Sequence, residues 1–322
     1  MNTNANTTAN TTPLLRLGTR GSPLALAPAH ETRRRLAAAH PELAGEDAVA
    51  IVVIKTTGDL IQDRALSEIG GKGLFTKEIE EALLDGTIDA AVHSMKDVPT
   101  WLPDGLVVEH LLPREDPRDA FFSPHGPRLA DLPRGAVVGT ASLRRQSQVL
   151  ARRPDLKVVT FRGNVATRLR KLADGEVDAT LLAVAGLNRL GEADKITAAL
   201  EPEEMLPAVG QGAVGLEIRA DDAKTRAWLD AIACSETTIR VTAERALLAE
   251  LDGSCKTPIA GLAEMNGASL RLRGLVALPD GSIAHSAEVT GAPGDAAALG
   301  KGLGEDLKVA GGTAFFAAIT GH

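Results

Sequence analysis

The chain has 322 residues, of which 44% are hydrophobic and 24% charged, with a formal net charge of −7 at pH 7. This length exceeds what one hydrophobic core usually organises, so we expect two or three domains. The acidic balance argues against nonspecific nucleic-acid binding as the main role. No apolar run reaches the roughly 20 residues of a membrane-spanning helix, which argues against a membrane protein.

The start of the chain is not expected to fold. Residues 1–13 are rich in Asn and Thr and lack the basic and apolar regions of a signal peptide. We predict a disordered tail and a cytoplasmic location for the protein. The two cysteines, Cys234 and Cys255, fit a reducing compartment better than a disulfide.

The first part of the chain alternates strand and helix patterns. The apolar run Val49–Ile54 is typical of a strand that is buried on both faces. Ser22 fits a helix N-cap and Pro23 fits the first helical position, so the free backbone N–H groups there could bind an anion. Glycines surround Lys72, and we expect this loop to close over a ligand. The strands predicted in this part are 14–17, 49–54, 89–92 and 107–112, and a helix is predicted over 77–84.

The segment that follows Asp89 ends in a sequence that a strand cannot continue. Lys96 and Asp97 precede Pro99, so they must lie just past the carboxyl end of this strand. In open α/β sheets, ligands bind at that edge. A lone Lys-Asp pair is more often a surface ion pair, but several other segments also place a cation just after a strand.

The middle of the chain is unusually basic. Residues 142–171 contain nine Lys or Arg residues and a single acid, Asp155, inside an otherwise acidic protein. This block suggests a focused site for an anionic ligand, although some of its members must be solvated surface residues. Strands predicted at 136–139, 157–161 and 179–184 each lead into a helix, which indicates a mostly parallel second sheet.

The chain is predicted to cross between two lobes twice. Residues 114–120 form the first crossing, and a strand at 216–218 could rejoin the first sheet after the Gly-rich return 207–215. From Ser235 the pattern changes to α+β, with helices near 236–251 and 295–309 and a hairpin of strands 270–278 and 283–290. The predicted domains are 14–112 with 212–230, then 117–206, then 235–322.

Cys255 lies in the loop 252–258, between Gly-Ser and Lys-Thr-Pro, so we expect it to be more exposed than a core cysteine. Lys256 and nearby arginines would favour its thiolate. The histidines lack metal-ligand spacing, and we predict no metal. His93 is the only histidine near a strand end, and nothing marks it as the base of a thiol protease.

Six motifs together resemble the porphobilinogen deaminase family, in the family's order and from about Leu14 onward. They are TRGSPLAL (19–26), GGKGLF (70–75), AVHSMKD (91–97), GTASLRRQ (139–146), LLAVAGL (181–187) and AVGQG (208–212). The resemblance implies two α/β lobes like those of type II periplasmic binding proteins, with a cleft between them, and a smaller C-terminal α+β domain. It also implies a monomeric transferase of heme biosynthesis.

The resemblance also implies a chemistry. A dipyrromethane cofactor would be linked by a thioether to Cys255, and four porphobilinogen molecules would be added to it in turn with loss of ammonia. Hydrolysis would then release the linear tetrapyrrole hydroxymethylbilane. Asp97 matches the family's catalytic carboxylate, which can hold pyrrole N–H groups and stabilise the cations that form as ammonia leaves.

Carried over residue by residue, the resemblance gives three sets of candidates. The cofactor set contains Cys255, Lys96, Ser94, Thr140, Ser142, Arg144, Arg145, Gly163 and Asn164. The substrate set contains Arg16, Arg20, Ser22, Arg162, Arg168, Arg189 and Gln211. The lid set contains Lys72 and Phe75. Arginine predominates because its planar guanidinium binds carboxylates in a bidentate manner.

Two positions depart from the family pattern, and two other functions stay open. Glu68 stands where many relatives have lysine, and Pro28 stands where glutamine is common. An intracellular two-lobed anion-binding protein would explain the arginines, although not Cys255 or Asp97. A Schiff-base enzyme would need the amine of Lys96 to be neutral, which neighbouring carboxylates would oppose.

Overall fold

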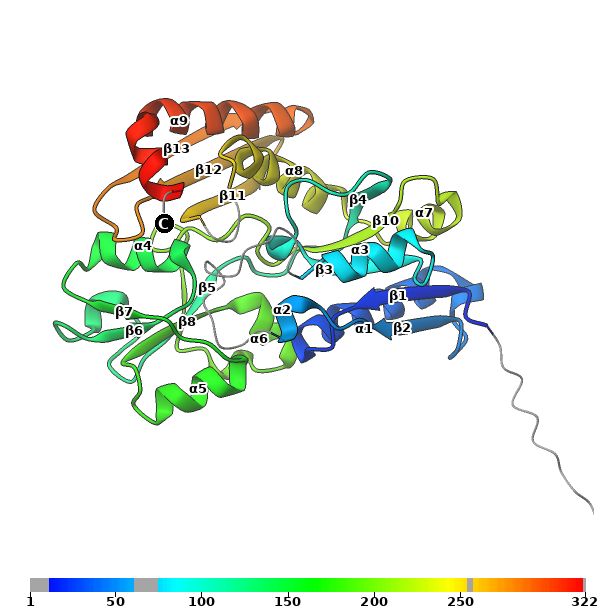
Figure 1. Cartoon of the computed structure of the whole chain (residues 1–322), viewed down its shortest axis with the longest axis horizontal. Coiled ribbons are helices and arrows are strands. Elements are labelled where there is room, and N and C mark those ends of the chain that lie inside the picture. Colours follow the sequence, from blue (N-terminus) through cyan, green and yellow to red (C-terminus); the bar gives the residue numbers. More distant parts are fainter. Residues whose placement is uncertain (1–11, 61–74, 254–256, 321–322) are drawn as a thin grey trace, which may run out of the picture.

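The structure is a computed structural model that describes residues 12–60, 75–253 and 257–320 (Figure 1). Most of the predicted N-terminal tail lies outside these residues, as do the lid candidate Lys72, the departure at Glu68 and the cofactor candidate Cys255. Within the described residues, no helix is both long and apolar enough to cross a membrane.

The first sheet contains β1 (Leu15–Thr19), β2 (Val49–Val53), β3 (Ala90–Ser94), β4 (Leu106–Leu111) and β10 (Val214–Arg219). Their order is β2-β1-β3-β10-β4. Strand β1 runs parallel to β2 and β3, whereas β10 is antiparallel to β3 and β4. The polarity of the parallel strands defines one edge where their carboxyl ends meet.

Helices cover both faces of this sheet, as the continuous apolar strands predicted. On one face, α1 (Pro23–Ala39) and α7 (Ala223–Asp230) share a core with Leu17 and Val92. On the other face, α3 (Lys77–Leu84) packs against a core that contains Ala91. Successive side chains of a strand point to opposite faces, so neighbouring residues of β3 enter different cores.

The second sheet contains β5 (Asp119–Phe122), β6 (Val137–Gly139), β7 (Lys157–Val159), β8 (Ala179–Ala183) and β9 (Ala198–Leu200). Their order is β7-β6-β8-β5-β9, the same pattern as in the first sheet. Strand β6 is parallel to β7 and β8, and β5 is antiparallel to β8 and β9.

Three helices belong to this second lobe, and each follows one of its parallel strands. They are α4 (Leu143–Arg152), α5 (Val165–Ala173) and α6 (Val184–Leu190). Each therefore begins at the sheet edge where ligands are expected.

The antiparallel strand of each sheet is the one that follows a crossing between the lobes. Strand β5 comes after the first crossing and β10 after the second. The two crossings touch, because the Glu115 N–H donates to the carbonyl of Gly212 over 3.1 Å. This arrangement confirms the predicted class of two α/β lobes.

The third part of the chain is a three-stranded antiparallel sheet covered by two helices (Figure 1). Its strands are β11 (Ile259–Asn266), β12 (Ser269–Ala277) and β13 (Ala284–Gly291), and α8 (Ser235–Glu250) and α9 (Ala296–Thr320) share their core. The predicted small α+β unit is confirmed, although the exact limits of all three domains stay a prediction.

Three strands, two helices and one helix end differ from the sequence prediction, the helices being α2 (Thr57–Leu60) and α7. Strands β5, β9 and β11 were not predicted, and β5 lies partly in the segment interpreted as a crossing. The last helix was predicted to end near Val309, whereas α9 runs to Thr320 across a kink at Gly312, where φ is 68°. Glycine tolerates this left-handed backbone, so the chain turns there and continues as helix.

Candidate active site

Two cavities lie between the lobes, at the carboxyl ends of the parallel strands. The first has a volume of about 390 Å³ and the second about 250 Å³. Four residues line both cavities: Lys96, Asp97, Arg145 and Arg168. One acid and three cations, drawn from both lobes, therefore stand where the two cavities meet.

Lys96 and Asp97 belong to a short 3-10 turn, η2 (Met95–Asp97), directly after β3. The turn is anchored by Met95, whose side chain is buried and whose N–H donates to the carbonyl of Ala213 over 3.0 Å. The Asp97 residue itself is exposed, whereas Met95 packs into the core beneath the turn. The sequence prediction that this pair lies just past a strand end is confirmed.

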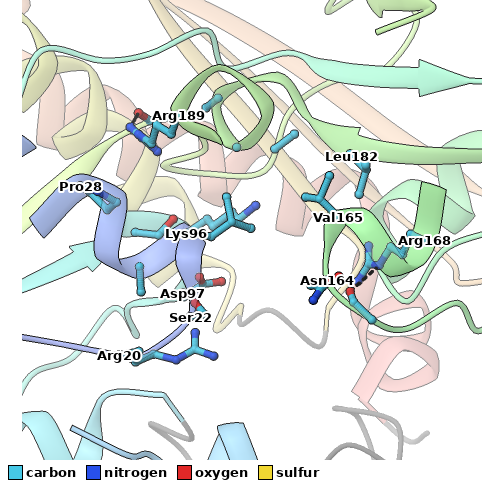
Figure 2. Close-up of a pocket in the computed structure, with 18 of the residues that line it drawn as sticks. Arg20, Ser22, Pro28, Lys96, Asp97, Asn164, Val165, Arg168, Leu182 and Arg189 are labelled. Atoms are coloured by element: carbon cyan, nitrogen blue, oxygen red, sulfur yellow. Dashed lines mark hydrogen bonds between the residues drawn. The ribbon is translucent and has the colours of Figure 1, made fainter. Parts of the chain in front are cut away.

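Figure 2 shows how the labelled side chains surround the first cavity. Lys96 and Asp97 lie on one side with Arg20 and Ser22, and Arg168 lies across the space from them on α5. Further lining residues from the predicted sets are Ser94, Gly163, Asn164 and Arg189.

The ammonium of Lys96 lies in a crowded electrostatic environment. Removal from water lowers its pKa below the ordinary value, Asp97 opposes this change, and Arg145 reinforces it. Lys96 is partly exposed to the cleft, but most of its surroundings are protein atoms and not water. Burial therefore favours the neutral amine and Asp97 favours the charged one, and the expectation that carboxylates keep Lys96 charged stays a prediction.

The second cavity brings the third part of the chain to the site. Thr257 and Ile259 line it beside Ser142, Arg144 and Gln211. Thr257 is the first described residue after Cys255. The described chain therefore resumes in the wall of this cavity, two residues after Cys255.

A buried carboxylate organises the two arginines of α4. Asp119 is fully buried and accepts from Arg144 Nη1 at 2.8 Å, from Arg145 Nη2 at 2.7 Å and from Gln211 Nε2 at 2.9 Å. Burial alone would raise the pKa of Asp119, but the charges and hydrogen bonds of both arginines hold it well below its usual range. Two guanidinium groups and one carboxylate leave this cluster with one net positive charge.

Sequence reasoning missed Asp119, which lies in the segment interpreted as a crossing. Its partners are 25, 26 and 92 residues away along the chain. The only local signal is an acid at the start of an apolar run, which is too common to single out.

Several cationic side chains near the cleft keep buried donor atoms without a partner among the described residues. These atoms are Arg144 Nε, Arg162 Nη2 and Arg189 Nε. Arg189 also donates from Nη2 to the carbonyl of Gly212 over 2.8 Å. Burial lowers the pKa of Arg168 to about 10, with Arg145 and Arg162 adding to the effect. Buried donors of this kind suit an anionic ligand, which would supply the missing acceptors.

Three site candidates are helix N-caps, but they differ in how they use their side chains. The Asn164 side chain accepts from the Thr167 N–H at 2.8 Å, and Ser142 caps α4 through the Arg145 N–H. Ser22 is the N-cap of α1 but makes no side-chain capping bond. Thr140 is buried under its turn, where its hydroxyl accepts from the Ser142 N–H, and it lines neither cavity.

One predicted cation lies away from the others. Arg16 forms a bidentate ion pair with Asp89, with distances of 2.6 and 2.9 Å. Arg16 is the second residue of β1 and lies at the amino end of this strand, whereas the site lies at the carboxyl ends of the parallel strands. The structure therefore does not bring Arg16 together with the other candidates.

The lid candidate Phe75 contacts one cation of the first cavity. The guanidinium of Arg20 stacks over the ring of the lid candidate Phe75, 4.2 Å from its centroid. Pro28, one of the two departures from the family pattern, lies inside α1 and lines the cavity. Among the described residues, no group of three or more His, Cys, Asp or Glu side chains could hold a metal ion.

The fold and the cleft define a two-lobed α/β protein with a cationic site between its lobes. The family model "Porphobilinogen deaminase, dipyromethane cofactor binding domain" matches residues 15–227, and "Porphobilinogen deaminase, C-terminal domain" matches residues 238–309. The chain belongs to the porphobilinogen deaminase family. It is accordingly a transferase of tetrapyrrole biosynthesis, and residues 15–227 contain the dipyrromethane cofactor-binding domain.

Named relatives are similar over most of the chain. Porphobilinogen deaminase of Paracoccus denitrificans is 62% identical over 91% of this chain and 93% of its own. The chloroplastic enzyme of Oryza sativa is 56% identical over 94% and 86%. Among solved structures, the periplasmic aliphatic sulphonate binding protein of Escherichia coli matches 74% of this chain and 70% of its own, with 16% identity and a TM-score of 0.40.

Proposed function

We propose that this enzyme joins four porphobilinogen molecules, one at a time, onto a dipyrromethane primer held by Cys255, and then releases hydroxymethylbilane by hydrolysis. Each addition forms one carbon–carbon bond, expels one ammonia and removes one proton from the acceptor α-carbon. The final release consumes one water. The observation that carries the proposal is the position of Asp97, an exposed carboxylate among cations where two cleft cavities meet.

The cations of the cleft would hold the carboxylates of the pyrrole rings. Each ring carries an acetate and a propionate, so the growing chain gains two negative charges per addition. Arg20, Lys96, Arg145, Arg168 and Arg189 line the first cavity and are our candidates for this role. Charge-assisted hydrogen bonds to guanidinium groups are among the strongest that proteins make.

Asp97 would act on the groups that react. As an anion it can accept hydrogen bonds from pyrrole N–H groups and stabilise the positive charge that develops as ammonia departs. It can also take the proton that leaves the newly joined carbon. Lys96, beside it on the same turn, would supply a cation for a carboxylate and keep the carboxylate of Asp97 oriented.

The residues around the second cavity fit an anionic cofactor. Arg144 keeps a buried Nε donor without a partner among the described residues, and Gln211 and Ser142 line the same wall. When bound, the dipyrromethane supplies the free α-carbon that accepts the first porphobilinogen. Thr257 lines this cavity two residues after Cys255, which supports Cys255 as the point of attachment.

Two other functions have less support. An anion-binding protein without catalysis would not require the exposed Asp97 among the cations, and family membership argues against it. A Schiff-base mechanism gains some support from the lowered pKa of Lys96, but the adjacent carboxylate favours the charged amine. That the enzyme is monomeric, acts in the cytoplasm and binds neither membrane nor nucleic acid stays a prediction.

The variant Asp97→Asn tests the proposal. We expect kcat for porphobilinogen consumption to fall by about 10²–10⁴-fold, the usual contribution of an acid–base group, with cofactor attachment intact. Asp104→Asn is the matched control, because Asp104 is also exposed but lines neither cavity. Near-normal kcat in Asp97→Asn, with the control also unchanged, would remove Asp97 from the mechanism.

A further inference from the structure

A turn of the third domain contacts the helix that carries Arg144 and Arg145. The turn joins β12 to β13 and meets α4 of the second lobe (Figure 1). Gln146, the residue directly after Arg145, donates from Nε2 to the carbonyl of Pro279 over 3.1 Å. The helix that lines the second cavity is thus tethered to a different part of the chain.

The contact is closest at Gly281, the tip of the turn. A Cβ atom at this position would lie 2.4 Å from the backbone N of Ala151 and 2.6 Å from the carbonyl oxygen of Ser147. Both are backbone atoms of α4, which cannot move aside as a flexible side chain could. Gly281 also has a φ of 71°, a conformation that glycine adopts without steric cost.

The turn is held rigidly before it reaches the helix. The Leu278 N–H donates to Ile283 over 2.8 Å, and the Gly281 N–H donates to Leu278 over 2.9 Å. The Asp280 carboxylate accepts from the Ser282 N–H at 3.0 Å and from its hydroxyl at 2.7 Å. A turn with these internal bonds can set the position of a partner instead of adapting to it.

The contact point is coupled to the arginines through one turn of helix. The Ser147 hydroxyl donates to the Arg144 carbonyl over 3.1 Å, and its own carbonyl faces Gly281. Helix α4 has ten residues, about 15 Å in length, and moves as a rigid unit over that distance. A shift at Ser147 would therefore displace Arg144 and Arg145 relative to Asp97, which lies on the other lobe.

We propose that the β12–β13 turn is a positioning element, which sets the distance between the arginines of α4 and the Lys96–Asp97 turn by seating Gly281 against α4. This proposal rests on the proposed function, since it assigns these arginines to carboxylates of the pyrrole chain. A displaced α4 weakens the hold on substrate carboxylates in the ground and transition states alike. Such a loss raises KM, whereas Asp97 and kcat are little affected.

The variant Gly281→Ala tests the proposal, with Gly267→Ala as its matched control. Gly267 lies in the β11–β12 turn with a φ of 60°, but a Cβ there would meet nothing within 4 Å. Both variants place a side chain at a positive φ, and only Gly281→Ala pushes on α4. We expect KM for porphobilinogen to rise at least about fivefold in Gly281→Ala, with kcat within about threefold, and both constants within about twofold in the control.

Hydrogen exchange gives a readout that does not depend on turnover. The amides of residues 143–152 should exchange faster in Gly281→Ala than in Gly267→Ala. A loss of folded protein alone would lower kcat at unchanged KM, and that result would overturn the proposal, as would equal KM values in the two variants. If Gly281→Ala does not fold, Gln146→Ala decides, since a raised KM supports the proposal and an unchanged KM overturns it.

The same experiment separates this proposal from the function on which it rests. If the wild-type enzyme did not consume porphobilinogen, the proposed function would fail. If the wild type turned over normally and Gly281→Ala behaved like Gly267→Ala, only the positioning role would fail.

Discussion

Asp119→Asn is a substitution for which the structure predicts a large loss of stability. The Asp119 carboxylate is fully buried, and its two guanidinium partners on α4 are at most 7% exposed. Asparagine keeps the size and one acceptor oxygen but removes the negative charge. The two arginines would then keep two buried positive charges with no anion between them.

The size of the effect follows from this geometry. Breaking a buried ion pair by removing one partner typically costs about 3–5 kcal/mol, because the remaining charge is uncompensated. Total unfolding free energies are about 5–15 kcal/mol, so this loss would be a large fraction of the whole. We expect urea unfolding, followed by circular dichroism, to show a destabilisation of that size in Asp119→Asn.

The pH dependence gives a second test of the same carboxylate. Its pKa is lower in the folded protein than in the unfolded chain, so its stabilisation is complete above the ordinary Asp pKa of about 4. The stabilisation is lost as the pH falls through the lowered folded pKa. The difference between wild type and Asp119→Asn should therefore be constant from pH 8 to 5 and shrink only in stronger acid.

Asp155→Asn is the control for this prediction. Asp155 pairs with Arg153 in the same lobe, but both side chains are solvent-accessible, and such pairs add little to stability. Its unfolding midpoint should stay close to that of the wild type. Equal midpoints for Asp119→Asn and Asp155→Asn would refute the reasoning about the buried cluster.

Three other predictions concern the cations of the cleft. Arg168→Ala should lower kcat/KM by about 10–100-fold, the effect of losing a hydrogen bond to a charged group, because Arg168 lines both cavities. Arg16→Ala should leave steady-state kinetics unchanged, because Arg16 pairs with Asp89 at the opposite strand end; a comparable loss in both variants would contradict the placement. Burial lowers the pKa of Lys96, so its charge is lost as pH rises through that lowered value, and KM should increase there in the wild type but not in Lys96→Arg. Identical KM profiles for these two proteins would contradict a role for the charge of Lys96.

Local sequence signals predicted most of the architecture. The helix predicted over 77–84 has the bounds of α3, and the predicted N-cap Ser22 is the N-cap of α1. These features depend on residues within one or two turns of each other. The position of Lys96–Asp97 past a strand was predictable for the same reason, although β3 ends at Ser94, before Pro99 is reached.

The features that sequence analysis missed depend on distant partners or on short elements. Strand β9 has three residues, too few for a periodic pattern, and β11 contains alanines and a glycine, which favour strands weakly. The role of Asp119 requires α4 to pack beside β5, which no local pattern encodes. Arg16 was grouped with Arg20, but at about 3.3 Å per residue a strand separates these positions by more than 10 Å.

The covalent primer is the central claim about this enzyme, and the intact mass of the purified protein tests it most directly. We predict that the wild type and Cys234→Ala exceed the mass of their sequences by one dipyrromethane, and that Cys255→Ala does not. An unmodified but fully active wild type, or a mass excess that persists in Cys255→Ala, would contradict the account.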